Sequence, residues 1–203
     1  IHINRNVFNQ IFSLHNISLS GDAYSSYCET MFKELGFDNV ASIDCSPYEN
    51  ATIVHDMNKP ILKIMEKYDY IYDGGTIEHI FNTAQVCENI INLLKVGGIF
   101  CSVTCNNNFS GHGIYQFSPE FFMSAFSEEY GMEILSLHLA QVGTLYHEWI
   151  DVKSYGNGRN ETKFNNTNPV YIIAIARKIS EGRKSLIHDS PQQYSYEQID
   201  WKK

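Results

Sequence analysis

Three acidic side chains each follow a short apolar run whose length and composition are typical of a β-strand. The acids are Asp44, Asp56 and Asp73, and the runs are 40–43, 51–54 and 68–72. In an open α/β sheet, ligands bind beyond the carboxyl ends of the strands, which is where these side chains are expected. One carboxylate there can accept both hydroxyls of a ribose, and another can accept from an adenine amino group. Because Asp is also a frequent turn and cap residue, a nucleoside site and a purely structural role both stay open.

A second group of polar residues follows the next expected strand, 99–104. His112 stands between Gly111 and Gly113, and near neutral pH an imidazole can take a proton from an attacking hydroxyl or amine. His79 is a second candidate base, with the adjacent Glu78 as its partner or as a substrate ligand, although packing or capping is a competing role for this histidine. Further candidates for hydrogen bonds to a substrate are Asn106, Tyr115 and Gln116.

Helical and strand-like apolar spacing alternate along the chain. Helices are expected at 4–14, 20–35, 60–66, 83–94 and 118–126, and strands at 40–43, 51–54, 68–72, 99–104, 132–139 and 170–176. Gly97 and Gly98 are expected to break the chain before the strand at 99–104, and 141–168 to form a long insertion or flexible loop. The alternation predicts an α/β fold with a doubly wound, mostly parallel sheet. No helix-sized pattern separates the last two strands, and we expect them to form an antiparallel pair.

Composition narrows the classes of function. The chain has 203 residues, 43% of them hydrophobic, and a net charge of −8 with dispersed Lys and Arg, which argues against a nucleic-acid substrate. No apolar run is long enough to span a membrane. The five cysteines are odd in number and scattered, and Cys101, Cys105 and His112 without a fourth ligand are read as core thiols and a histidine, so no metal site is expected. A cytoplasmic location is predicted, and the oligomeric state is left open.

A specific resemblance is carried by two segments in a fixed order. Residues 68–80 read YDYIYDGGTIEHI and residues 93–100 read LLKVGGIF. Together they resemble the fourth-strand motif and the Lys-x-Gly-Gly turn of class I S-adenosylmethionine-dependent methyltransferases of the small-molecule type. The resemblance extends over about 40–126, and it implies a Rossmann-like fold, S-adenosylmethionine as cofactor and S-adenosylhomocysteine as product.

The resemblance also implies roles for individual residues in holding the cofactor. Asp44 matches the acid that holds the ribose, with Cys45 and Ser46 beside the adenine, and Asp56 and Met57 match the pair next to the adenine ring. Gly74 and Gly75 fall where the backbone approaches the methionine part of the cofactor, and Asp73, directly before them, is also expected to bind the cofactor.

The sequence departs from the family at its start. The glycine-rich turn after the family's first strand has no counterpart before Asp44, where Gly21 is isolated. We expect a methyltransferase domain over 1–179, whose first strand and turn lie upstream or are missing, and a polar tail over 180–203 docked by Tyr194, Tyr196 and Trp201 or mobile.

The sequence therefore predicts methyl transfer to a small polar acceptor, with O-methyl transfer preferred. A sugar, a sugar nucleotide or a phosphorylated intermediate of surface-polysaccharide synthesis is the suggested acceptor class. Two alternatives stay open: a non-catalytic nucleotide-binding subunit with a methyltransferase-like fold, and a nicotinamide-dependent oxidoreductase in which Asp44 holds the ribose.

Overall fold

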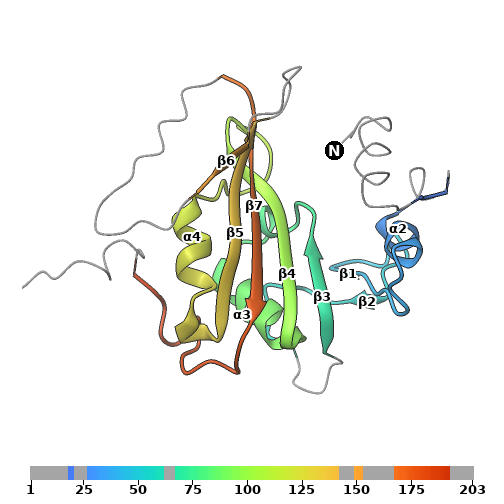
Figure 1. The fold of residues 1–203 in the computed structure, drawn as a ribbon, viewed down its shortest axis with the longest axis horizontal. Helices are drawn as coiled ribbons and strands as arrows, with labels where there is room; N and C mark the ends of the chain where they lie inside the picture. Colours follow the sequence, from blue (N-terminus) through green and yellow to red (C-terminus); the bar gives the residue numbers. More distant parts are fainter. Residues whose placement is uncertain (1–17, 21–26, 62–66, 142–148, 153–166, 193–203) are drawn as a thin grey trace, which may run out of the picture. The chain divides into compact units, whose positions relative to one another are not determined.

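The computed structural model describes residues 18–20, 27–61, 67–141, 149–152 and 167–192 (Figure 1). The chain divides into two compact units, Ile1–Asp56 and Met57–Lys203, and each is described by itself. The helix predicted at 4–14, most of the helix predicted at 60–66 and the three aromatic residues of the predicted tail lie outside the described residues.

The first unit contains one described helix, α2 (Cys28–Glu34), and two short strands. α2 ends as the sequence predicts, because Gly36 takes a left-handed φ of 95° and the Phe37 amide donates to the Phe32 carbonyl at 3.1 Å. The helix begins at Cys28, later than the predicted start, and its N-cap Tyr27 makes no side-chain capping hydrogen bond.

β1 (Ile43–Asp44) and β2 (Ile53–Val54) pair in parallel, with Asp44 opposite Val54. Both strands are shorter than predicted, and Asp44 lies within β1 where the sequence placed it just after the strand. Hydroxyl contacts reinforce the start of the pair: the Ser42 amide donates to Thr52 Oγ1 and the Thr52 amide to Ser42 Oγ, both at 3.3 Å.

The second unit is built on a five-stranded sheet with the order β3-β4-β7-β5-β6 (Figure 1). Its strands are β3 (Tyr68–Asp73), β4 (Leu94–Asn107), β5 (Met132–Gln141), β6 (Trp149–Asp151) and β7 (Val170–Lys178). β3, β4 and β5 run in one direction, and β7 runs between β4 and β5 in the opposite direction. The predicted α/β class and the antiparallel pair of C-terminal strands are confirmed. β6 was not predicted, since its three residues lie in the segment expected to be an insertion.

The expected break at Gly97 and Gly98 is an irregularity inside a longer strand. β4 already pairs at Leu94, opposite Tyr68, and the register shifts before Ile99 pairs with Tyr70. Gly97 has a φ of 90°, and a Cβ on Gly98 would lie 2.9 Å from the Lys95 carbonyl oxygen. Glycines therefore allow the extra residues to bulge out while the strand continues.

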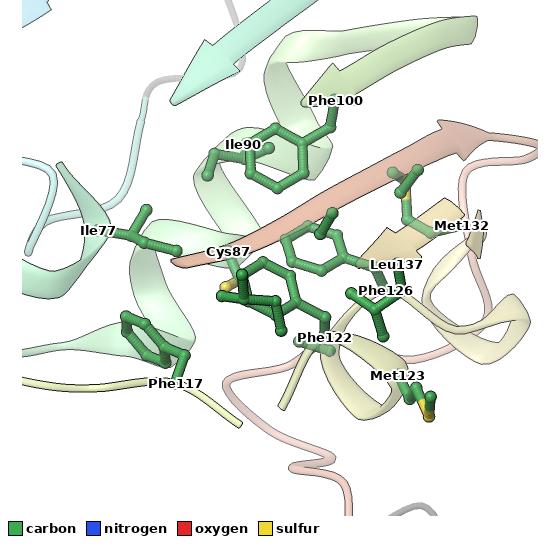
Figure 2. Close-up of a cluster of buried hydrophobic side chains, with 14 of the residues drawn as sticks. Ile77, Cys87, Ile90, Phe100, Phe117, Phe122, Met123, Phe126, Met132 and Leu137 are labelled. Atoms are coloured by element: carbon green, nitrogen blue, oxygen red, sulfur yellow. The ribbon is translucent and has the colours of Figure 1, made fainter. Parts of the chain in front are cut away.

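Two helices pack on one face of this sheet around an aromatic core (Figure 2). α3 (Thr83–Leu93) and α4 (Pro119–Ala125) form close to their predicted bounds, α4 with Ser118 as N-cap and Pro119 at the first position. On β4, Phe100 is fully buried between the helices, and its ring lies 4.8 Å from that of Phe126, centroid to centroid. The same inner face carries two buried hydroxyls nearer the carboxyl end of the strand, Ser102 and Thr104.

A buried lysine closes the end of α3 that lies away from the carboxyl ends of β3 and β4. Lys178 is fully buried, and its ammonium donates to the carbonyls of Ile91 and Leu94 at 2.9 and 3.2 Å. Glu181 supplies the opposite charge at 3.0 Å. The last turn of a helix leaves carbonyls without intrahelical partners, and this side chain satisfies two of them.

The beginning of the predicted tail packs on the sheet domain. Leu186 joins the core with 2% of its surface exposed, and its amide donates to Glu88 Oε2 at 2.9 Å. The Tyr130 hydroxyl donates to the Asp189 carbonyl. Among the described residues, no helix has the length and hydropathy required to cross a membrane.

Candidate functional site

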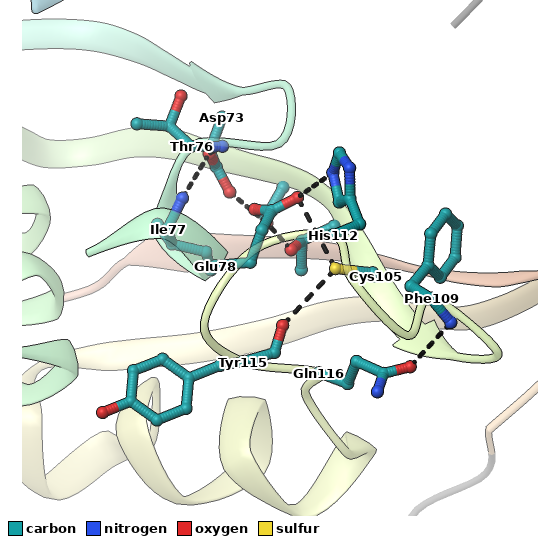
Figure 3. Close-up of polar contacts among 11 residues, drawn as sticks. Asp73, Thr76, Ile77, Glu78, Cys105, Phe109, His112, Tyr115 and Gln116 are labelled. Carbon is teal, nitrogen blue, oxygen red and sulfur yellow. Dashed lines mark hydrogen bonds and ion pairs between the residues drawn. The ribbon is translucent and has the colours of Figure 1, made fainter. Parts of the chain in front are cut away.

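The turn after β3 is organised by the side chain of Asp73. Asp73 Oδ1 accepts from the amides of Thr76 and Ile77 at 2.8 and 3.3 Å, and Oδ2 accepts from Ser102 Oγ at 2.6 Å (Figure 3). Burial raises the pKa of this carboxyl, against the hydrogen bond from Ser102. Asp73, which the family resemblance places beside the cofactor, thus stabilises the conformation of the turn through these hydrogen bonds.

The two glycines of this turn differ in how strictly their surroundings restrict a side chain. Gly75 has a φ of 98°, and a Cβ there would lie 3.1 Å from Glu78 Oε1. A Cβ on Gly74 would lie 2.8 Å from the ring of Tyr72. Gly75 is therefore favoured by its left-handed backbone and by the nearby Glu78, whereas a side chain at 74 would require the half-exposed Tyr72 ring to move.

Glu78 is a buried carboxylate in the short 3-10 helix η2 (Ile77–His79), directly after this turn. It is 1% exposed, and its Oε2 accepts from Thr104 Oγ1 at 2.7 Å. The other oxygen, Oε1, lies 3.7 Å from the thiol of Cys105 and 3.8 Å from His112 Nε2. Burial is the main reason that the pKa of the Cys105 thiol is raised, and the charge of Glu78 adds to it.

The two candidate histidines meet above this carboxylate. His79 follows Glu78 in η2, and His112 comes from the loop after β4; their ring centroids are 5.1 Å apart in an edge-on arrangement. Half of the His112 side chain is exposed. The structure therefore brings His112 beside Glu78 and His79, which precede it in the sequence by more than 30 residues.

The loop that carries His112 is fixed to Glu78 by its backbone. The amides of Ile114 and Tyr115 donate to the Glu78 carbonyl at 2.7 and 3.1 Å, and the His112 amide donates to Phe109 O at 3.0 Å. A Cβ on Gly113 would lie 3.0 Å from Glu78 Cγ. One of the two glycines that flank His112 therefore allows the loop to approach Glu78 closely.

The predicted substrate ligands of the loop make hydrogen bonds within it. Asn106 Nδ2 donates to Phe117 O at 2.7 Å, Gln116 Oε1 accepts from the Phe109 amide at 2.9 Å, and the Tyr115 hydroxyl donates to Phe81 O at 3.0 Å. These three side chains hold the loop in shape around His112, and their contact with a substrate stays a prediction.

Among the remaining predicted cofactor residues, Met57 is the first residue of the second unit, whereas the others are in or after β1 and β2, in the unit Ile1–Asp56. Asp44 Oδ1 accepts hydrogen bonds from the amide and the hydroxyl of Ser46 at 2.7 and 3.1 Å. The hydrogen bond from the Ser46 amide is the main reason that the pKa of this exposed carboxyl is lowered. The His55 amide donates to Asp44 O at 2.8 Å, so Asp44 and the segment that ends at Asp56 share one edge of the strand pair. Cys45 is exposed beside them.

Asn89 is a residue that the sequence interpretation missed. It lies on α3 and is 1% exposed, and its Nδ2 donates to the carbonyls of Met57 and Lys59 at 3.2 and 2.8 Å. Its Oδ1 accepts from the amide of Ile61 at 3.0 Å. A buried amide within the apolar stripe of a predicted helix was the available signal. Asn89 fixes the segment that contains Met57, the residue expected beside the adenine.

Ser102 and Thr104 were also missed. Their signal was the alternation Phe100, Ser102, Thr104 on the inward positions of a strand, since buried hydroxyls need partners. The partners are the carboxylates of Asp73 and Glu78.

No protein-family model and no curated protein matches this sequence. Among solved structures, the chain is similar to an S-adenosylmethionine-dependent methyltransferase from Anabaena variabilis, with 16% identity over 74% of this chain and 72% of that one and a TM-score of 0.49. It is also similar to a candidate methyltransferase solved with the Trm112 activator of Haloferax volcanii (12% identity, 75% and 78% covered, TM-score 0.48). A third is a candidate methyltransferase from Bacillus halodurans (15% identity, 80% and 81% covered, TM-score 0.44). Because these TM-scores lie below 0.5, function is inferred from the residues of the site.

Proposed function

We propose that this chain transfers a methyl group from S-adenosylmethionine to a small polar acceptor. The observation that carries the proposal is the pairing of Glu78 with His112 beside the glycine turn at 74–75. Both come from loops at the carboxyl ends of the parallel strands β3 and β4, which is the ligand-binding edge of an open α/β sheet.

The residues present fit the cofactor in their chemistry. The turn at 74–75 gives a backbone surface without side chains, suited to the methionine part. Asp44 is exposed, and hydrogen bonds from Ser46 hold the pKa of its carboxyl low, so near neutral pH it is an anion that can accept from ribose hydroxyls. Asp56 and Met57 are the proposed contacts of the adenine, and Cys45 and Ser46, which follow Asp44, are proposed to lie beside it as well.

His112 is the proposed base. When bound, S-adenosylmethionine supplies a methyl group whose carbon–sulfur bond breaks with the electron pair going to sulfur, leaving S-adenosylhomocysteine. The acceptor oxygen forms the new bond to carbon, and its proton passes to the imidazole of His112. Glu78 stabilises the imidazolium that forms, while the loop bonds of Asn106 and Gln116 keep the ring in place. Positioning a nucleophile and removing one proton is all that this displacement asks of the protein.

A hydroxyl of a sugar, a sugar nucleotide or a phosphorylated saccharide intermediate is the proposed acceptor. The support is the polar character of the loop over 106–116, which offers amide and imidazole groups near the exposed side of the cluster.

The test is the release of S-adenosylhomocysteine from the full chain supplied with S-adenosylmethionine and panels of sugars and sugar nucleotides. A general base contributes about 100-fold or more to a rate, so His112→Ala should lower turnover by that factor with little change in cofactor affinity. His188→Ala removes an exposed histidine elsewhere and is the matched control. Equal losses of turnover and cofactor affinity in His112→Ala would contradict the role given to this residue.

A further inference from the structure

The side chains of Glu78, His79 and His112 form a cluster with the composition of a metal site. Each offers one ligand atom, and the three atoms all lie within 4.8 Å of one another. The carboxylate is buried and both histidines are exposed, so the cluster is covered by protein on the Glu78 side and open to solvent on the histidine side. A metal ion could enter from the open side and keep positions for water or substrate.

The charge around Glu78 favours a cation. Within the described part of the chain, its carboxylate contacts a hydroxyl, a thiol and an imidazole, and it forms no ion pair with a lysine or arginine. A second buried carboxyl, Asp73, belongs to the same turn. Burying a carboxylate is costly unless it is paired or coordinates a metal. Oε1, the oxygen without a hydroxyl partner, is the one that faces His112 (Figure 3).

The three side chains are also held in place before any ion binds. Glu78 and His79 are neighbours in η2, and the hydrogen bond from Thr104 restricts rotation of the Glu78 carboxylate. The His112 loop is attached to Glu78 by two backbone hydrogen bonds to its carbonyl and by the close approach of Gly113. Such supporting contacts orient the ligands of metal sites in general.

We propose that Glu78, His79 and His112 together bind one divalent transition-metal ion. Two imidazoles and one carboxylate suit Zn²⁺, Mn²⁺ or Fe²⁺ better than Mg²⁺ or Ca²⁺, which prefer oxygen ligands throughout. Bonds of about 2.0–2.2 Å put ligand atoms about 3–3.5 Å apart, so the most distant pair needs to close by up to about 1.3–1.8 Å. The exposed imidazoles can make that movement.

Metal binding itself does not depend on methyl transfer, whereas its use in catalysis rests on the proposed function. A bound cation makes a coordinated hydroxyl more acidic, which would activate the acceptor oxygen directly. His112 would then act as a ligand, and its role as base applies to the metal-free chain. The site differs from the cysteine-based one considered from the sequence, because neither Cys101 nor Cys105 is among its proposed ligands.

Titration of the chelator-treated full chain with Zn²⁺, and separately with Co²⁺, tests the proposal. Calorimetry should show one equivalent bound, and Co²⁺ should develop visible absorption bands. His79→Ala and His112→Ala should each weaken binding by about 10-fold or more and abolish the Co²⁺ bands. His188→Ala is the control and should bind as the unchanged chain does. Circular dichroism of each variant shows that it is folded, and Glu78→Gln provides a third variant of nearly the same size.

Two results would overturn the proposal. One is the absence of a stoichiometric site; the other is binding of equal strength in His79→Ala, His112→Ala and the control, which would place the ion elsewhere. Binding of S-adenosylhomocysteine measured on the same samples keeps the two proposals separate. Cofactor binding without metal binding overturns the metal site alone, and metal binding without cofactor binding overturns the methyltransferase proposal alone.

Discussion

Replacing Asn89 by alanine should destabilise the second unit by removing the clamp on the segment 57–61. The side chain makes hydrogen bonds to the backbone of Met57, Lys59 and Ile61, and the Ile61 amide is in a buried residue. A buried donor that loses its partner costs about 1–3 kcal/mol, and each lost bond to a more exposed carbonyl costs about 0.5–1.5 kcal/mol. We therefore expect a loss of about 2–6 kcal/mol in the free energy of unfolding.

Urea unfolding followed by circular dichroism measures this loss. Asn92→Ala, an exposed position on the same helix, is the control for removing an asparagine from α3, and it should stay within about 0.5 kcal/mol of the unchanged chain. Asn89→Ala should also weaken S-adenosylhomocysteine binding, because the clamped segment contains Met57. If the two variants unfold at the same urea concentration, Asn89 does not hold this segment.

Two further substitutions test the turn after β3 and the pairing of Lys178. Gly75→Ala should lower the melting temperature more than Gly97→Ala does. Both glycines have a left-handed φ near 90°, which costs an alanine about 1–2 kcal/mol. Only at position 75 would the new Cβ also lie close to another atom, Glu78 Oε1. Equal melting temperatures of the two variants would show that the turn after β3 adjusts to the added methyl group, contrary to this prediction. The pKa of Glu181 is lowered, chiefly by its hydrogen bond from the buried Lys178. The stability that this exposed carboxylate contributes is therefore present above the unfolded pKa and is lost as pH falls through the folded one. Glu181→Gln should thus lower stability near neutral pH by less than about 1 kcal/mol, with the difference disappearing in acid; a difference independent of pH would contradict this pairing.

The sequence was sufficient for the elements whose pattern is long and regular. α3, β5 and β7 were expected close to their observed bounds, because an apolar face or an apolar run of that length has few alternatives. β6 was missed since three residues carry no periodicity, and the bulge at Gly97 was taken for a break because glycines mark both. The short strands β1 and β2 were predicted to exist, but their ends depend on pairing that the local sequence does not show.

The candidate site was predicted in its residue types better than in its contacts. Glu78, His79 and His112 were named from their chemistry, and the structure places them together. The hydrogen bonds of Asn106 and Gln116 within their loop were not foreseen, because a polar side chain offers the same groups to its own backbone and to a substrate. The hydroxyls of Ser102 and Thr104 belong to pairs that only form when β4 aligns with β3.

Calorimetric titration of the full chain with S-adenosylhomocysteine tests the central claim most directly. The proposed function predicts one site per chain with micromolar affinity, weakened about 10-fold or more by Asp44→Ala, because that carboxylate is the proposed ribose ligand. A chain that gives no binding heat at millimolar ligand, or an Asp44→Ala variant that binds as tightly as the unchanged chain, would contradict the proposed cofactor site.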